Sequence, residues 1–129
     1  MNDSAIIAAF ENATLAEFHH RDHVRAAWCY LRSSTVIGAL ERFTRALKRF
    51  AAAQGKPQLY HETITWAYLF LIHERMQDGE TWEGFAERNS DLLVWRPSIL
   101  DRYYRLETIA SDRARHRFIL PDAAYEDFR

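Results

Sequence analysis

The sequence predicts an all-α protein, and three observations support this fold class. Apolar residues recur at spacings of three and four along most of the chain, which is the period of an amphipathic helix. No segment shows the alternation of apolar and polar residues that is typical of strands. The 129 residues include only 4 Gly and 3 Pro, so few positions interrupt the helices. We therefore expect a single helical domain over residues 1–129, built as a compact bundle of five or six helices.

The first three predicted helices begin and end at recognisable signals. They are expected at about residues 3–12, 20–32 and 35–53, with a connector at residues 14–18. Ser33 and Ser34 lie where one helix should stop and the next should find its N-cap. Gly55 is a natural C-terminal stop, and Pro57 prevents the third helix from continuing.

A fourth helix, at about residues 62–77, differs from the others because its middle has almost no polar face. A helix that is apolar all round is usually surrounded by other elements, so we expect this one near the centre of the bundle. Gly79 should end it, and Thr81 and Ser98 should cap two shorter helices. From Ala110 onward the chain is rich in Arg and Asp, and we expect an irregular end.

Composition excludes several classes of function. The formal net charge is −1, which argues against nucleic-acid binding by bulk charge. No apolar run reaches the ~18 residues needed to span a bilayer. The N-terminus has Asp3 and no basic leader, so we expect a cytoplasmic soluble protein rather than a secreted one. Cys29 is the single cysteine, which excludes a disulfide within the chain, and we expect it in the core.

The histidines suggest where chemistry takes place. His19, His20 and His23 fall within one and a half turns, at the start of the second predicted helix. Residues three or four apart share a helix face, so His23 and either His20 or His19 can direct two imidazoles at one point. The pair His20 and His23 fits better if the helix begins at about residue 20, but His19 is not excluded as a replacement for His20.

A second polar cluster lies where the fourth helix begins. His61 and Glu62 are in its first turn, and Thr65 follows one turn later. A carboxylate is stabilised at a helix N-terminus by about 0.3–1 kcal/mol, which is a purely structural reason for Glu62. That reason does not account for the histidine beside it.

Together the two clusters predict a metal centre with the ligands His20, His23, His61 and Glu62. Such donors suit one divalent transition metal, and Zn, Fe, Cu, Ni and Mn remain open. Glu62 would be a fourth ligand or the catalytic general base. Asp22 and Thr65 are candidates for orienting the imidazoles. The competing interpretation is that all these residues are caps, surface residues or histidines with hydrogen bonds in the core.

We therefore expect a small metal-dependent enzyme that acts on a small-molecule substrate by hydrolysis, hydration, elimination or isomerisation, or by oxidation if the metal is Fe or Cu. An aromatic pocket beside the metal would be lined by Trp28, Tyr30, Trp66 and Tyr68. The alternative is a non-catalytic module that binds a ligand or partner and contains a buried network of His and Glu. A homodimer with the fourth helix at its interface is a third interpretation.

Part of this pattern resembles a group of small uncharacterised bacterial proteins over about residues 15–122. The resemblance rests on Phe18-x-His20-x-Asp22-His23 with Ala27-Trp28, on Gly55 and Tyr60-His61-Glu62-Thr63, and on Ser111-x-x-Ala114-Arg115 with Pro121-Asp122. It implies that the two histidine segments belong to one module. It implies no activity.

Overall fold

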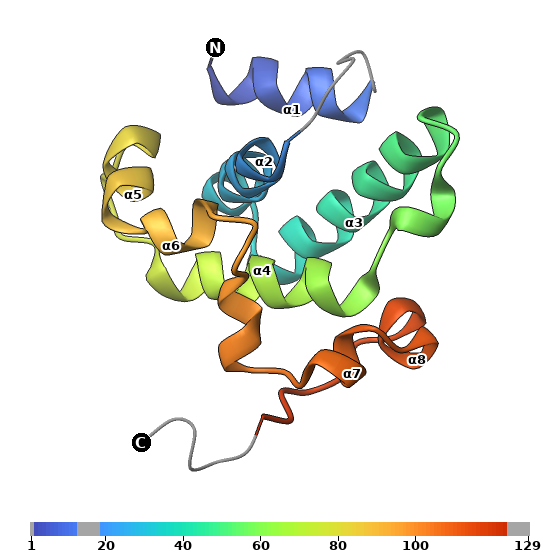
Figure 1. The fold of residues 1–129 in the computed structure, drawn as a ribbon. Helices are drawn as coiled ribbons and strands as arrows, with labels where there is room; N and C mark the ends of the chain where they lie inside the picture. Colours follow the sequence, from blue (N-terminus) through green and yellow to red (C-terminus); the bar gives the residue numbers. More distant parts are fainter. Residues whose placement is uncertain (1, 13–18, 124–129) are drawn as a thin grey trace.

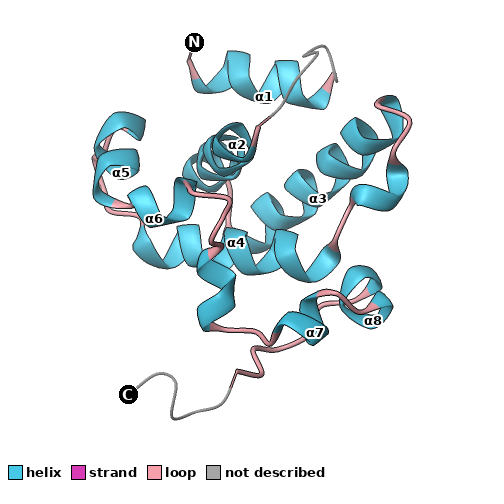
Figure 2. Ribbon diagram, in the orientation of Figure 1, coloured by secondary structure: helices cyan, strands magenta, loops and turns pink. Residues whose placement is uncertain are grey.

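The computed structural model describes residues 2–12 and 19–123, and over these residues all regular structure is helical (Figures 1 and 2). The elements are α1 (Asp3–Glu11), α2 (His20–Ser33), α3 (Val36–Ala53), η1 (Pro57–Leu59), α4 (Glu62–Arg75), α5 (Trp82–Arg88), α6 (Ser90–Leu93), η2 (Ile99–Arg102), α7 (Leu106–Ile109) and α8 (Asp112–His116), where η denotes a 3₁₀ helix. The predicted all-α bundle is confirmed. The connector expected at residues 14–18 lies outside the described residues.

The helices begin and end close to their predicted positions, with one shift at a cap. The side chain of Thr35 accepts a hydrogen bond from the backbone of Gly38, so Thr35 is the N-cap of α3. Ser34, which was expected to cap α3, instead ends α2 in an extended conformation. Gly55 ends α3 as predicted, with a positive φ of 72°, a backbone conformation that costs glycine little.

Two helices share the centre of the molecule. α4 packs against α2, α3, α8 and η2, as its apolar middle predicted. α2 is at least as enclosed, because all residues from Ala26 to Leu31 are buried. α1 lies across α2, α3 diverges from α2 toward η1, and α4 crosses below both (Figure 1). α4 is not surrounded on every side, since Phe70 is 36% exposed.

The C-terminal segments are held against α4 by buried polar groups. The hydroxyl of Thr63 donates to the carbonyl of Arg117 (2.7 Å) and accepts from the backbone N–H of Ile119 (3.1 Å). Tyr104 donates its hydroxyl hydrogen to the Ile119 carbonyl (2.7 Å). These bonds satisfy backbone groups that no regular element pairs. The path of residues 104–119 therefore depends on the first turn of α4.

Three predicted boundaries differ from the structure. α4 ends at Arg75 rather than near 77, because Met76 is already extended. Residues 99–102 form a 3₁₀ helix capped by Ser98. The tail contains a short helix, α8, because the Ser111 side chain accepts a hydrogen bond from the backbone of Ala114 and caps it.

No helix in the described part of the chain is both long and apolar enough to cross a membrane. Cys29 is buried in the core, as expected. Burial is the main reason that the pKa of its thiol is raised to about 12.

Candidate functional site

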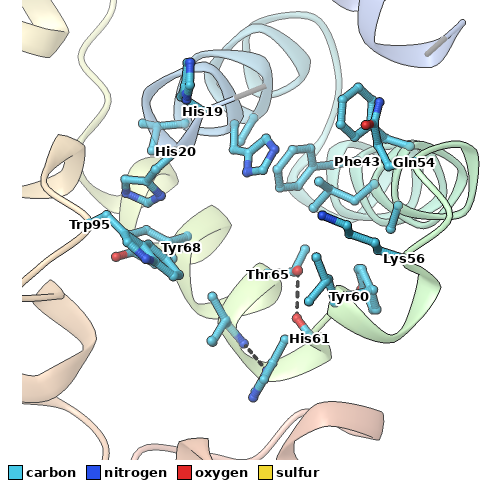
Figure 3. Close-up of a pocket in the computed structure, with 18 of the residues that line it drawn as sticks. His19, His20, Phe43, Gln54, Lys56, Tyr60, His61, Thr65, Tyr68 and Trp95 are labelled. Carbon is cyan, nitrogen blue, oxygen red and sulfur yellow. Dashed lines mark hydrogen bonds between the residues drawn. The ribbon is translucent and has the colours of Figure 1, made fainter. Parts of the chain in front are cut away.

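A cavity of about 490 Å³ lies between α2, α3 and the beginning of α4. Most of its wall is apolar and includes Val24, Phe43, Leu47, Phe50 and Ile64. His19, His20, His23 and His61 also line it, and we call it the histidine cavity (Figure 3). Its volume lies within the ~300–1,000 Å³ that is usual for small-molecule sites. The combination of apolar walls with a few polar groups is also typical of such sites.

The structure thus brings the two predicted histidine clusters to the same cavity, although they are far apart in sequence. α2 supplies His20 and His23 from its first turns, and His19 precedes it. His61 comes from the other side, at the N-cap of α4. The four imidazoles are placed by helix N-termini, where the backbone positions of the first turn are well defined.

His20 is held between two aromatic rings and a backbone carbonyl. Its Nε2 lies 2.8 Å from the Leu92 carbonyl oxygen and therefore donates to it. The ring centroid is 4.8 Å from that of Tyr68 and 5.1 Å from that of Trp95 (Figure 3). Burial lowers the pKa of His20, and the bond to Leu92 only partly opposes this. His20 is therefore an oriented, uncharged imidazole.

His23 is the histidine whose protonation is most strongly suppressed. Burial is the main reason that its pKa falls to about 4, and the nearby His20 contributes, while Asp22 opposes the change. Its ring packs against Phe10 with centroids 6.2 Å apart. A base with such a low pKa is uncharged at neutral pH and accepts protons poorly.

Both ring nitrogens of His61 are engaged in hydrogen bonds. Nδ1 accepts from the backbone N–H of Ile64 (3.1 Å), and Nε2 lies 2.7 Å from the Ile109 carbonyl oxygen. Since a carbonyl only accepts, Nε2 carries the proton and the ring is neutral. Burial lowers the pKa of His61, which agrees with this tautomer. The imidazole is thus a helix cap and a tether to α7.

Glu62 does not line the histidine cavity. Its carboxylate accepts a hydrogen bond from the Tyr60 hydroxyl. That bond and burial raise the pKa of Tyr60, with burial the larger cause. Asp22 accepts from the backbone N–H of His19 (3.0 Å), and Thr65 donates to the His61 carbonyl (2.7 Å). These polar groups stabilise their own helix ends rather than orienting imidazoles.

The expected ligand set is therefore only partly assembled. His20, His23 and His61 line one cavity, but within residues 2–12 and 19–123 no three His, Cys, Asp or Glu side chains are close enough to hold a metal ion. The predicted divalent metal and the role of Glu62 as its ligand or as general base stay predictions.

The expected aromatic lining is correct for only one of four residues. Tyr68 lines the cavity and shares a hydrogen bond with Ser98 (3.0 Å). Trp28 is buried against Trp82 and Phe85, and Tyr30 donates to Glu11. Trp66 stacks on Phe118, with ring centroids 5.2 Å apart. These three rings belong to other parts of the core and to the contact with the C-terminal segment.

Sequence reasoning missed the side of the cavity formed by the end of α3 and the segment that follows. Gln54, Lys56 and Tyr60 line it there, and Lys56 extends toward its interior (Figure 3). Lys56 follows the left-handed Gly55, and this turn after α3 was visible in the sequence. No local sequence pattern predicts the distance between this turn and α2.

Comparisons with known proteins add no relative from which a function is inferred: no protein-family model, no curated protein and no solved structure matches the chain. The resemblance to small bacterial proteins stays a prediction.

We predict that His61→Ala lowers the free energy of unfolding by about 2–3 kcal/mol, because α4 loses its cap and the Ile109 carbonyl loses its donor. His61→Asn retains a capping side chain and should recover about half of the loss. His73→Ala, at the exposed other end of α4, is the control. Urea unfolding monitored by circular dichroism measures all three. Equal stability of H61A and H73A would refute the structural role.

We also predict that stability falls as the pH is lowered from about 6.5 to about 4. In this range the unfolded chain protonates His23 and the folded chain does not, so falling pH favours unfolding. The loss attributable to His23 is at most about 3.4 kcal/mol, at about 1.4 kcal/mol per pH unit. His23→Gln should flatten the curve of unfolding free energy against pH, whereas His116→Gln on the surface should not. Parallel curves for H23Q and wild type would contradict the assignment.

Proposed function

We propose that the protein binds an apolar small molecule in the histidine cavity. The observation that carries this proposal is a cavity of about 490 Å³ with mostly apolar walls, whose lining residues include histidines from two separate elements. Apolar walls supply most of the binding free energy in such sites, and a few oriented polar groups supply specificity. His20 has a fixed orientation and is suited to the second task.

Binding is better supported than acid–base catalysis. The lining residues that the structure describes include neither Asp nor Glu, so none of them is a carboxylate that could act as a general base. The pKa of His23 is about 4 and that of His20 is lowered, which makes both weak bases at neutral pH. A general base is most effective when its pKa lies near the working pH. The cavity has the properties of a recognition site more than those of a proton-transfer site.

Metal-dependent catalysis at the same place is a second candidate. One observation favours it, namely that three of the four predicted ligands line one cavity. To bind a metal ion, His61 would have to give up its bond to Ile64 or to Ile109. The cost of leaving one of these backbone groups unpaired, about 1–3 kcal/mol, is small beside the binding energy of a tight metal site.

Filling the histidine cavity tests the first proposal. Leu47→Trp places a larger side chain at a half-buried position of the lining. The neutral fluorescent probe N-phenyl-1-naphthylamine should bind wild type saturably, and L47W should weaken its affinity by about tenfold or more because the space is occupied.

Leu71→Trp is the matched control for this experiment, since Leu71 is half-buried on α4 and lies outside the cavity lining. It should retain wild-type affinity. Circular dichroism verifies that both variants are folded. If the folded wild type fails to bind the probe, or if L47W binds it as tightly as wild type, the proposed site is wrong.

Metal content tests the second candidate. Protein purified without a histidine tag from cultures supplemented with Zn, Fe, Cu, Ni and Mn in turn should contain about one equivalent of one of these metals. His20→Ala and His61→Asn should each lose it while remaining helical. Plasma mass spectrometry measures the metal. A metal-free wild type under every condition would eliminate this candidate and leave the binding proposal intact.

A further inference from the structure

We infer that the molecule bound in the histidine cavity is an organic carboxylate: an apolar body bearing one anionic group that pairs with Lys56. This inference rests on the proposed function and identifies the chemical class of the ligand. It is carried by the charges around the cavity and by the position of one ammonium group.

Lys56 is the one permanently charged side chain in the cavity lining that the structure describes. Within residues 2–12 and 19–123, no Asp, Glu or Arg lines the cavity. Because burial lowers the pKa values of His20, His23 and His61, these imidazoles add no positive charge at neutral pH. Among the described lining residues, Lys56 is therefore the one lysine or arginine, and its ammonium lies at the edge of a mostly apolar volume.

The local structure directs Lys56 toward the cavity. The backbone N–H of Lys56 donates to the Ala51 carbonyl (2.9 Å), and Gly55 turns the chain in the left-handed conformation. Pro57 then begins η1, which keeps this turn short. From here the Lys56 side chain reaches toward the interior between Phe43 and Tyr60 (Figure 3).

The described part of the chain provides no ion-pair partner for the ammonium of Lys56. Among residues 2–12 and 19–123, no carboxylate lies within ion-pair distance of it. Lys48, eight residues earlier, illustrates a different arrangement, because its ammonium lies over the Tyr60 ring, 5.1 Å from the centroid. An unpaired cation beside an apolar cavity attracts an anion that brings its own apolar surface.

A single lysine in the cavity lining favours a ligand with a carboxylate group over a ligand with a phosphate group. Phosphate sites usually combine several donors, such as an arginine fork, a glycine-rich loop or a long helix N-terminus directed at the anion. The lining has no arginine, and the imidazole of His61 already caps α4. A single ammonium, with the Gln54 amide also in the lining, matches one negative charge.

The test compares acids with their uncharged amides. Benzoate, phenylacetate and 2-naphthoate, each paired with its amide, are titrated into the full chain by isothermal calorimetry. At least one acid should bind about tenfold more tightly than its amide at low salt, which is about 1.4 kcal/mol. The preference should shrink as sodium chloride is raised, because Lys56 is exposed and its charge is screened.

Two lysine variants test whether the preference for the acid over its amide comes from Lys56. Lys56→Met should abolish the preference for the acid while leaving the amide affinity within about twofold. Lys48→Met should leave the preference intact, since Lys48 does not line the cavity. If amides and acids bind equally, or if K56M keeps the preference, the carboxylate inference is wrong while the proposed binding function stands. If neither acids nor amides bind while N-phenyl-1-naphthylamine does, the carboxylate inference is wrong and the proposed binding function stands; if that probe also fails to bind, both are wrong.

Discussion

The first turn of α4 is the constraint on which the rest of the structure depends. Two buried polar side chains there, His61 and Thr63, together form four hydrogen bonds to backbone groups. Three of these bonds reach residues 109–119, where the regular structure is limited to the last residue of α7 and the short helix α8. Because an unpaired buried backbone group costs about 1–3 kcal/mol, these partners are not easily exchanged for others. They fix the start of α4 and, with it, one wall of the cavity.

A cavity of this size persists because the helices around it are held apart at one end. α2 and α4 pack closely along the buried run of α2, whereas α3 diverges toward η1 (Figure 1). Small residues face the gap, with Ala27 on α2 and Ala51 on α3. Unfilled apolar space forfeits contacts that a tighter core would make, so it lowers stability. A ligand that fills it would restore those contacts and stabilise the fold.

Much of the fold follows from local sequence signals. The parts of the fold that could not be predicted involve contacts between residues far apart in the sequence or choices between adjacent residues. Apolar periodicity and Gly55 define α2 and α3 because both act over a few residues. Ser34 was expected to cap α3, but the adjacent Thr35 does so, and both residue types are good caps. α8 was missed because its five residues carry almost no apolar period.

The site shows the same division between local and distant effects. The spacing of His20 and His23 predicted that they share a helix face, and they line one cavity. The partner of His61 is a carbonyl 48 residues away, which no spacing rule reveals. Trp66 and Tyr68 appeared equivalent in the sequence, but residues two apart on a helix point to different faces. Only Tyr68 therefore reaches the cavity.

The histidines that suggested a metal serve a different purpose if the cavity binds an organic molecule. An imidazole that is buried and neutral offers a donor and an acceptor without the desolvation cost of a charge. Carboxylates in the same positions would be costly to bury and would repel an anion. Histidine side chains therefore keep the cavity polar at selected points but uncharged, and Lys56 at its edge becomes the dominant charge. The lowered pKa values of the histidines and the lysine at the cavity edge are then two aspects of one electrostatic arrangement, since protonated imidazoles would add positive charge at other points of the lining and Lys56 would no longer be the dominant cation.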